Sequence, residues 1–221
     1  MSSTMSDNSS SFNGHVSSDA EDTPLIQLLT VATTVLAQAL DLVENVLTTD
    51  DQLTVQSKYL PGSAIGMLVI LFIGSLLSTL VSISGKHLRH ARDHFLLLVD
   101  SVSSSAPHEL SYDVRVRNTP METKLSDARE ALKGMIAKLE EVVPTVTMNT
   151  PITLHAVTPQ MQTMETTFGR ELWFASLHAV HHWSMVRVIA GEMDIKLEEH
   201  FGFAPSTLVY HSSEPKAKAK I

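Results

Sequence analysis

Apolar residues recur every three or four positions in four stretches of the chain, and this spacing predicts four long amphipathic helices. The predicted helices span about residues 25–47, 86–102, 120–143 and 168–194. Helix-start and helix-stop signals support these limits, because Thr23 and Pro24 precede the first helix and Pro144 follows the third. Long helices joined by polar connections predict an all-α fold, a four-helix bundle.

A different pattern interrupts the helices between Val146 and Thr167. Apolar and β-branched residues alternate there with polar ones, and two prolines punctuate the segment. This alternation predicts a small β-like excursion, in the simplest case a hairpin, between the third and fourth helices. Flexible tails are expected at 1–23, which is rich in Ser, and at the basic end 211–221, so that the helical domain spans 24–210.

Residues 64–84, AIGMLVILFIGSLLSTLVSIS, contain no charged residue and are apolar on every face. About 20 such residues are long enough to cross a bilayer. Asp50 and Asp51 precede the segment, and the basic Lys86 and Arg89 follow it. A transmembrane helix would therefore place its C-terminal side in the cytoplasm, and the protein would be a single-pass membrane protein.

Two other interpretations of the apolar segment stand beside the membrane helix. Deleting 67–85 removes 19 residues, or 57 nucleotides, and joins SAIG to KHLRHARDHF with one glycine kept. Codons GGT-ATG at Gly66-Met67 and TCA-GGN at Ser84-Gly85 would supply the GT and AG ends of an intron. We therefore hypothesise a retained intron or gene-model error, which would make the protein cytoplasmic. A buried core helix is the third interpretation, and it fits least well because a bundle helix keeps one polar face.

Composition narrows the function classes. The length of 221 residues suits one domain with tails, and the net charge of −8 argues against nucleic acid as a partner. Cysteine is absent, which excludes disulfides, thiolate metal ligands and cysteine nucleophiles. Histidine is unusually frequent: there are 11, and six of them fall in 86-KHLRHARDHF-95 and 177-LHAVHHWSMVRVIA-190.

The spacing of these histidines favours a metal site. Residues four apart lie one turn apart on a helix, with Cβ atoms about 5–6 Å apart. His90 and His94 form one such pair, and His178 and His182 form another. Two pairs on different helices can build a nitrogen-rich site inside a bundle, and zinc and nickel are divalent ions that suit imidazole ligands.

Other polar groups near these pairs carry weaker signals. His87 either shares a face with the first pair or is a first-turn polar side chain, and His181 is expected at the surface. Tyr112, in a polar connector, is a candidate for reaching the metal pocket. Glu171 is expected to face solvent or a neighbouring helix, and no catalytic residue is identifiable.

Four segments outside the apolar run carry a family resemblance: KHLRHARDHF, YDVRVRNTPMET, RELWFASLHAVHHWSMVRVIAGE and FGFAPSTLVY. Together they resemble an uncharacterised branch of the DinB-like superfamily of metal-binding four-helix bundles. Members of this branch read roughly GxHxRHxxDHF, RELxFxxxHxxHHxAxIxVI and FGxAPSTL. The resemblance covers about residues 25–210 except 67–85, and the absence of the apolar run from the family pattern favours the intron hypothesis.

The DinB-like resemblance implies a divalent metal held by three histidines, one from the second helix and two from the last. By position these are His90, His178 and His182, with His94 as the alternative to His90. The resemblance also implies metal-dependent chemistry on a small-molecule substrate, because well-studied relatives are thiol-dependent transferases or isomerases.

Two functions are therefore predicted. The first is a metal-dependent transferase, thiol-dependent in the wider superfamily, or a hydrolase, with an unknown substrate. The second is a non-catalytic bundle stabilised by its metal and tethered to a membrane if 64–84 is genuine. Homodimerisation is compatible with either.

Overall fold

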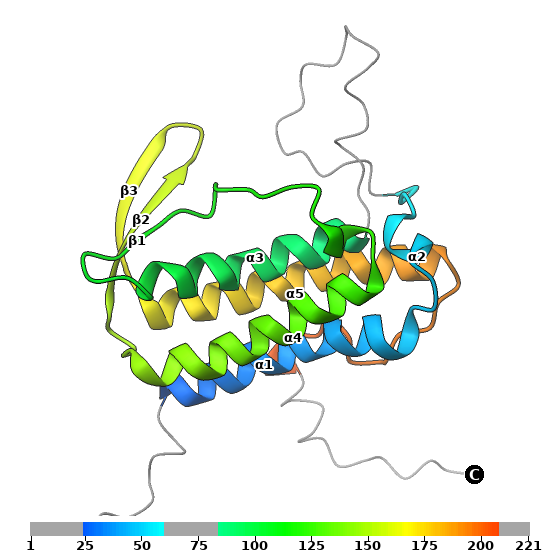
Figure 1. Cartoon of the computed structure of the whole chain (residues 1–221), viewed down its shortest axis with the longest axis horizontal. Coiled ribbons are helices and arrows are strands. Elements are labelled where there is room, and N and C mark those ends of the chain that lie inside the picture. Colours follow the sequence, from blue (N-terminus) through cyan, green and yellow to red (C-terminus); the bar gives the residue numbers. More distant parts are fainter. Residues whose placement is uncertain (1–23, 60–83, 208–221) are drawn as a thin grey trace, which may run out of the picture.

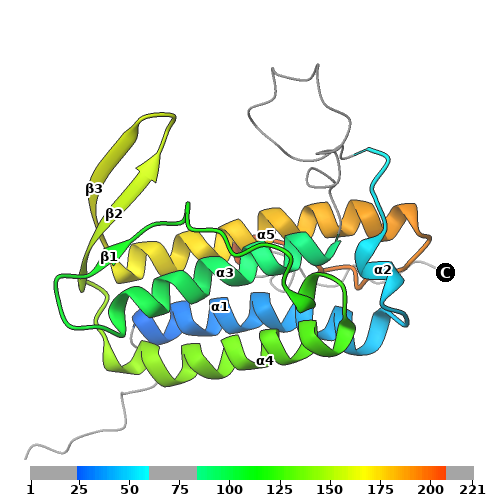
Figure 2. The same cartoon turned by 45° about the horizontal axis from the view of Figure 1, so that its top comes forward.

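A computed structural model describes residues 24–59 and 84–207 of the chain. Four long helices lie side by side in it, as Figures 1 and 2 show. These are α1 (Pro24–Asp41, continued by the π-helical turn η2, Leu42–Val46), α3 (Ser84–Val102), α4 (Leu125–Val142) and α5 (Phe168–Glu192). Each packs on two of the others: α1 on α4 and α5, and α3 on α4 and α5. The helix pair α3–α5 is the one that brings the two histidine stretches together.

The core between the helices is made by their apolar stripes. On α1 the buried positions are Leu25, Ala32, Val35, Leu36 and Ala39, and on α4 they are Ala128, Leu132, Met135 and Leu139. Both sets follow the three-four spacing seen in the sequence. Burying a large aliphatic side chain of this kind contributes roughly 1.5–3 kcal/mol, so the stripes account for the side-by-side packing.

The start of α4 differs from the prediction. A helix was expected from Pro120 onward, but Pro120–Glu122 forms a separate 3-10 turn, η4. The backbone then leaves helical geometry at Thr123 and is extended at Lys124 before α4 begins at Leu125. The amide of Leu125 donates to Asp50 Oδ1 at 2.8 Å, so a carboxylate from a distant loop fixes the true start of the helix.

The alternating segment forms a hairpin, as predicted, made of β2 (Pro151–Val157) and β3 (Met161–Thr167). The two strands are antiparallel, and Figures 1 and 2 show them projecting beyond the end of the helices. Alternate residues Ile152 and Leu154 are buried, so one face of β2 covers the core. The two-residue strand β1 (Glu109–Leu110) pairs with β2 in parallel, which the sequence pattern did not predict.

The segment after α5 closes the fold against α1 and α5. Phe201 stacks near Trp183 with ring centroids 6.3 Å apart, and the indole Nε1 donates to the Val35 carbonyl at 2.8 Å. Trp183 is thus a core residue. Trp173, by contrast, is 41% exposed because it lies on the outer face of α5.

The first turn of α3 packs against η4 without space for a side chain. A Cβ added at Gly85 would lie 2.1 Å from the backbone oxygen of Glu122, so this position requires glycine. Deletion of 67–85 would place Gly66 at this position in the chain. Residues 64–83 of the apolar run, on which the transmembrane and intron interpretations depend, lie outside the described residues.

Within the described ranges, the helix at Pro24–Val46 is long and apolar enough to cross a membrane by length and composition. About a third of its most apolar window (33%) is buried inside the protein. The same helix supplies residues to the hydrophobic core, so its apolar character has two explanations.

Candidate metal centre

Five histidines meet at the interface between α3 and α5. Three come from α3 and two from α5, and they are His87, His90, His94, His178 and His182. The ring centroids of His94 and His178 are 3.9 Å apart, and those of His90 and His182 are 4.8 Å apart. Both predicted histidine pairs therefore face each other across one helix–helix interface.

Three of these residues direct ligand atoms to one point. One nitrogen each from His90, His94 and His178 lies within 4.8 Å of the other two. His182 Nε2 is 3.1 Å from His178 Nε2. Two imidazole nitrogens bound to one tetrahedral zinc ion at 2.0–2.1 Å lie roughly 3.4 Å apart. The HxxxH pair on α5 is thus spaced for a shared ion.

The predicted ligand set is assembled, with two additions. His90, His178 and His182 come together, and His94 joins His90 where the sequence left the two as alternatives. His87 also belongs to the cluster, because its Nδ1 is 2.8 Å from His182 Nδ1. Its position three residues before His90 was the signal for this, since residues three apart share a helix face.

A hydrogen bond fixes the tautomer of His94. Its Nδ1 is 3.0 Å from the carbonyl oxygen of His90. A carbonyl oxygen only accepts, so Nδ1 carries the proton and Nε2 keeps a free lone pair. The ring of Tyr112 stacks on His94 at 4.6 Å with an interplanar angle of 12°, which holds the imidazole plane in place.

A buried carboxylate supports this arrangement from below Tyr112. Glu171 is fully buried and accepts from Tyr112 Oη at 3.0 Å, Thr166 Oγ1 at 2.7 Å and Arg170 Nη1 at 2.7 Å. Burial and the neighbouring Glu171 carboxylate raise the pKa of Tyr112, so its hydroxyl stays a donor. Glu171 was expected to face solvent or a neighbouring helix, but it is buried against the connector that carries Tyr112, because the first turn of α5 packs beneath that connector.

The histidines of the cluster are neutral near pH 7. Burial, followed by the neighbouring imidazoles, lowers the pKa of His90 and His178 to about 3. Burial also lowers the pKa of His87 to about 4 and that of His94 and His182 below the usual value. A neutral imidazole has a lone pair to offer, so desolvation prepares these side chains as ligands.

The residues present fit a divalent transition metal. In the described part of the chain, the convergent group is built from imidazoles alone, which suit zinc, nickel and copper better than magnesium or calcium. His181 lies outside the group and is exposed, as expected from its position next to His182. Neutral ligands would leave such an ion its full positive charge, and three protein ligands would leave a fourth position for an exogenous one.

The comparisons with known proteins give one relative. No protein-family model and no solved structure matches the chain. The chain is 29% identical to FK506-binding protein 5 of Rhizopus delemar over 187 residues, which cover 81% of this chain. It spans only 37% of the length of that relative, so more than half of FK506-binding protein 5 lies outside the match.

This relative overturns the DinB-like assignment. The match to FK506-binding protein 5 runs through 187 residues, whereas the DinB-like resemblance rested on short motifs. Histidines four apart occur wherever a helix directs two imidazoles to one side, so HxxxH is a weak marker of family. The prediction of a DinB-like, metal-dependent transferase or hydrolase was therefore wrong, and the similarity that the comparisons show is to FK506-binding protein 5.

Proposed function

We propose that this chain is a helical module, related to part of FK506-binding protein 5, that binds one divalent transition-metal ion between α3 and α5. The carrying observation is the convergence of His90, His94 and His178 within 4.8 Å. We further propose that the helices form a four-helix bundle of the kind that holds metals between facing helices. The relationship to FK506-binding protein 5 rests on the sequence match alone.

His182 is proposed as a fourth ligand. Its Nε2 lies beside that of His178, and its Nδ1 faces His87, which is placed to orient the ring. Zinc and nickel are the proposed ions, because both accept neutral imidazoles. A bound ion would link α3 to α5 and stabilise the folded state by about 2.7 kcal/mol at a free metal concentration 100 times the Kd.

Metal content and thermal unfolding test this proposal. The full chain should contain close to one zinc or nickel ion per molecule by elemental mass spectrometry after purification or reconstitution. The variant carrying His178→Ala and His182→Ala should lose that ion and the metal-dependent rise in Tm. His181→Ala is the matched control, because its imidazole neighbours the pair but is exposed. A folded parent that takes up no metal would refute the proposal.

FK506 binding is the second candidate function. It is favoured by the match to FK506-binding protein 5 and would bring peptidyl-prolyl isomerase or chaperone-like activity with it. Because the chain spans only 37% of that relative, the whole protein's activity is a proposal to be tested in this chain. Calorimetric titration with FK506 and a prolyl-isomerisation assay test this function. If residues 1–221 neither bind FK506 nor accelerate prolyl isomerisation, the function is rejected for this chain.

Partners and location follow as proposals. The net charge of −8 argues against nucleic acid as a partner. We propose a cytoplasmic protein if 67–85 is absent from the mature chain and a single-pass membrane protein otherwise. Transcript sequencing decides between the two. Light scattering tests homodimerisation.

A further inference from the structure

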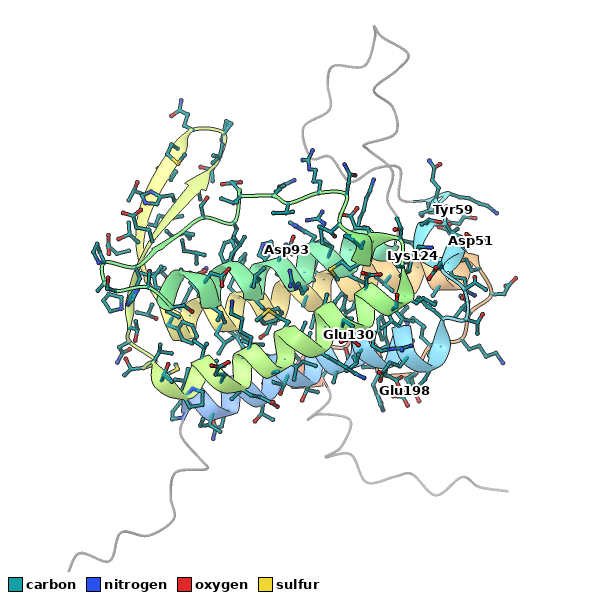
Figure 3. The ribbon with its side chains drawn as sticks, in the orientation of Figure 1. Asp51, Tyr59, Asp93, Lys124, Glu130 and Glu198 are labelled. Carbon is teal, nitrogen blue, oxygen red and sulfur yellow. The ribbon has the colours of Figure 1, made fainter. Side chains whose placement is uncertain are left out.

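The β-hairpin has one open edge. β3 lies at the end of the strand order β1-β2-β3, so one of its two edges has no neighbouring strand in the described part of the chain. Figures 1 and 3 show β3 on the outer side of the hairpin, away from β1. Residues 161–165 of β3 are exposed. An open strand edge presents unpaired amide and carbonyl groups to which another strand can bond.

The opposite edge of the sheet is covered. β1 pairs with β2 at Thr153 and Leu154, and the amide of Thr153 donates to the carbonyl oxygen of His108 at 2.9 Å. Further along β2, the amide of Val157 donates to Asp113 Oδ2 at 2.9 Å. Because β1 and the Asp113 side chain occupy this edge, a further strand can join the sheet only at β3.

β3 carries none of the features that commonly block an open edge. Such features are prolines, lysines, bulges and very short strands. β3 has seven residues, contains no proline and no basic residue, and pairs with β2 without an interruption of register. Its one charged residue is Glu165. The sequence of β3 therefore does not oppose pairing with a further strand.

Two hydrogen bonds at the ends of the hairpin show which groups of β3 face the open edge. The amide of Thr158 donates to the carbonyl oxygen of Gln160, and the amide of Phe168 donates to that of Thr150, both at 2.9 Å. Both pairs continue the register of the ladder, in which hydrogen-bonded and non-hydrogen-bonded pairs alternate. The even-numbered residues of β3 therefore bond to β2. The backbone groups that point to the open edge are those of odd-numbered residues: Met161, Thr163 and Glu165.

This edge is complementary to a second copy of itself in the antiparallel direction. With Met164 on a two-fold axis, Thr163 of each copy lies opposite Glu165 of the other, and these pairs exchange about four hydrogen bonds. Glu165 then faces a hydroxyl side chain and not its own copy, so no like charges meet. Met164, which is 43% exposed, lies against its counterpart, and the two side chains cover each other. Hydrogen bonds, charge and apolar surface therefore all match in this register.

We propose that β3 joins two copies of this chain into a homodimer, in which two antiparallel β3 strands form one continuous sheet with Met164 at its centre. The assembly closes at two copies, because each copy has one open edge and β1 and Asp113 cover the other. The interface lies outside the histidine cluster, and it depends neither on a bound metal ion nor on the match to FK506-binding protein 5.

The molar mass of the full chain and two substitutions at one position test the interface. Analytical ultracentrifugation should give twice the chain mass of 24.2 kDa. Thr163→Pro removes an amide that faces the open edge and none that bonds to β2. It should raise the dimer Kd at least about tenfold, because one hydrogen bond is lost from each copy.

Thr163→Val is the matched control for the proline variant. Both substitutions remove the contact of the Thr163 hydroxyl with His155 Nδ1, but valine keeps the amide and suits a strand. The dimer Kd of Thr163→Val should therefore equal that of the parent chain. Circular dichroism shows whether each variant is folded.

Single-cysteine variants test the register, because the chain has no cysteine of its own. Two copies of Met164 on the axis form a non-hydrogen-bonded pair, whose Cβ atoms lie about 4.5 Å apart, within reach of a disulfide. Met164→Cys should give a disulfide-linked dimer when added diamide takes up the two electrons and two protons of the thiols. Ser184→Cys, at an exposed position of α5, is the control and should stay a single chain on a non-reducing gel.

Each outcome decides the proposal. A chain that is monomeric at all concentrations, or a dimer with the same Kd in Thr163→Pro and Thr163→Val, would overturn it. Cross-linking at Ser184 and not at Met164 would also overturn it, because the copies would then meet through α5. If Thr163→Pro does not fold, Met164→Lys should separate the copies by bringing two positive charges together, whereas Met164→Leu should not. A dimer that survives Met164→Lys would overturn the proposal.

Discussion

Polar side chains are buried on two sides of helix α3, and they are neutral on one side and charged on the other. Toward α5, His90 and His94 are neutral, because burial lowers the pKa of each. Toward the connector and α4, Arg89 is equally buried but charged, because a guanidinium does not lose its proton in proteins. It is therefore paired with Asp93 and Glu122. His90 and His94, as neutral imidazoles, therefore keep lone pairs. The guanidinium of Arg89, on the other side of α3, is instead held by carboxylates.

This difference assigns different roles to the two sides. A side chain that can become neutral is available to a metal ion, whereas one that cannot must be balanced within the fold. The histidine side is thus the candidate site for an ion, and the arginine side is a scaffold. Four predictions, ordered by the size of the expected effect, test whether the contrast holds.

Lowering the pH should have the largest effect, and it acts on the histidine side. A histidine whose pKa is lowered in the folded state binds fewer protons there than in the unfolded chain, where its pKa is about 6.5. The free energy of unfolding of the metal-free protein should therefore be intact above pH 6.5 and fall between pH 6.5 and about 3, by up to about 1.4 kcal/mol per pH unit for each histidine kept neutral.

Urea unfolding at a series of pH values measures this. The variant His90→Asn should flatten the slope, whereas His181→Asn, at an exposed position, should not. A stability that is constant from pH 7 to pH 4 would contradict the buried, neutral state of the cluster.

Removing Arg89 should have the next largest effect, and it acts on the arginine side. Arg89→Met leaves Asp93 and Glu122 buried without their shared cation, which should cost about 3–5 kcal/mol of unfolding free energy. Lys124→Met is the control, because its ion pair with Asp50 is exposed and should matter little. Chemical denaturation gives both values, and similar losses in the two variants would remove the distinction between buried and exposed pairs.

A methyl group at Gly85 tests how tightly the first turn of α3 meets η4. Its Cβ would overlap the Glu122 backbone, so Gly85→Ala should destabilise the protein by about 1–3 kcal/mol. Gly134→Ala, with open space around it in α4, should instead stabilise by about 0.5–1 kcal/mol. Thermal unfolding compares the two.

The same test extends to the intron hypothesis. In a chain lacking 67–85, Gly66→Ala should reproduce the loss seen for Gly85→Ala in the full chain. If the shortened chain tolerates alanine at Gly66, that glycine has not taken the place of Gly85.

The smallest effect is expected at Tyr112, the residue of the connector whose ring stacks on His94. Tyr112→Phe keeps the ring that stacks on His94 but removes one of three donors to the buried Glu171, at a cost of about 1 kcal/mol. Metal affinity should fall up to about tenfold, because the ring is less firmly placed. Calorimetry with zinc measures the affinity. An unchanged stability would mean that Glu171 is satisfied by Thr166 and Arg170 alone.

The spacing of apolar and polar residues predicted those elements that depend on residues close together in the chain. The apolar stripe of α1, the hairpin at β2–β3 and the two histidine pairs each follow a fixed spacing, so the order of residues along the chain is enough to find them. The start of α4 was missed because Asp50, more than 70 residues away, caps Leu125. The strand β1 was missed because two residues carry no period of their own.

The family assignment failed for a related reason. A motif of histidines on one helix face reports the geometry of a helix, and unrelated chains share that geometry. The match to FK506-binding protein 5, at 29% identity over 187 residues, is a property of a long alignment and not of one short motif. The candidate ligands were nevertheless found, because their spacing alone places them on one side of each helix.

The sequence by itself determined which residues form helices and which histidines share a face, because both depend on positions three or four apart in the chain. Only the tertiary structure decided that α3 lies against α5, that His87 and His94 join the cluster, and that Glu171 is buried beneath Tyr112. These features depend on contacts between residues far apart in sequence. A cavity beside Arg92 is likewise a product of how four segments pack, namely α3, the connector, η4 and α4, and no local pattern encodes the space between them.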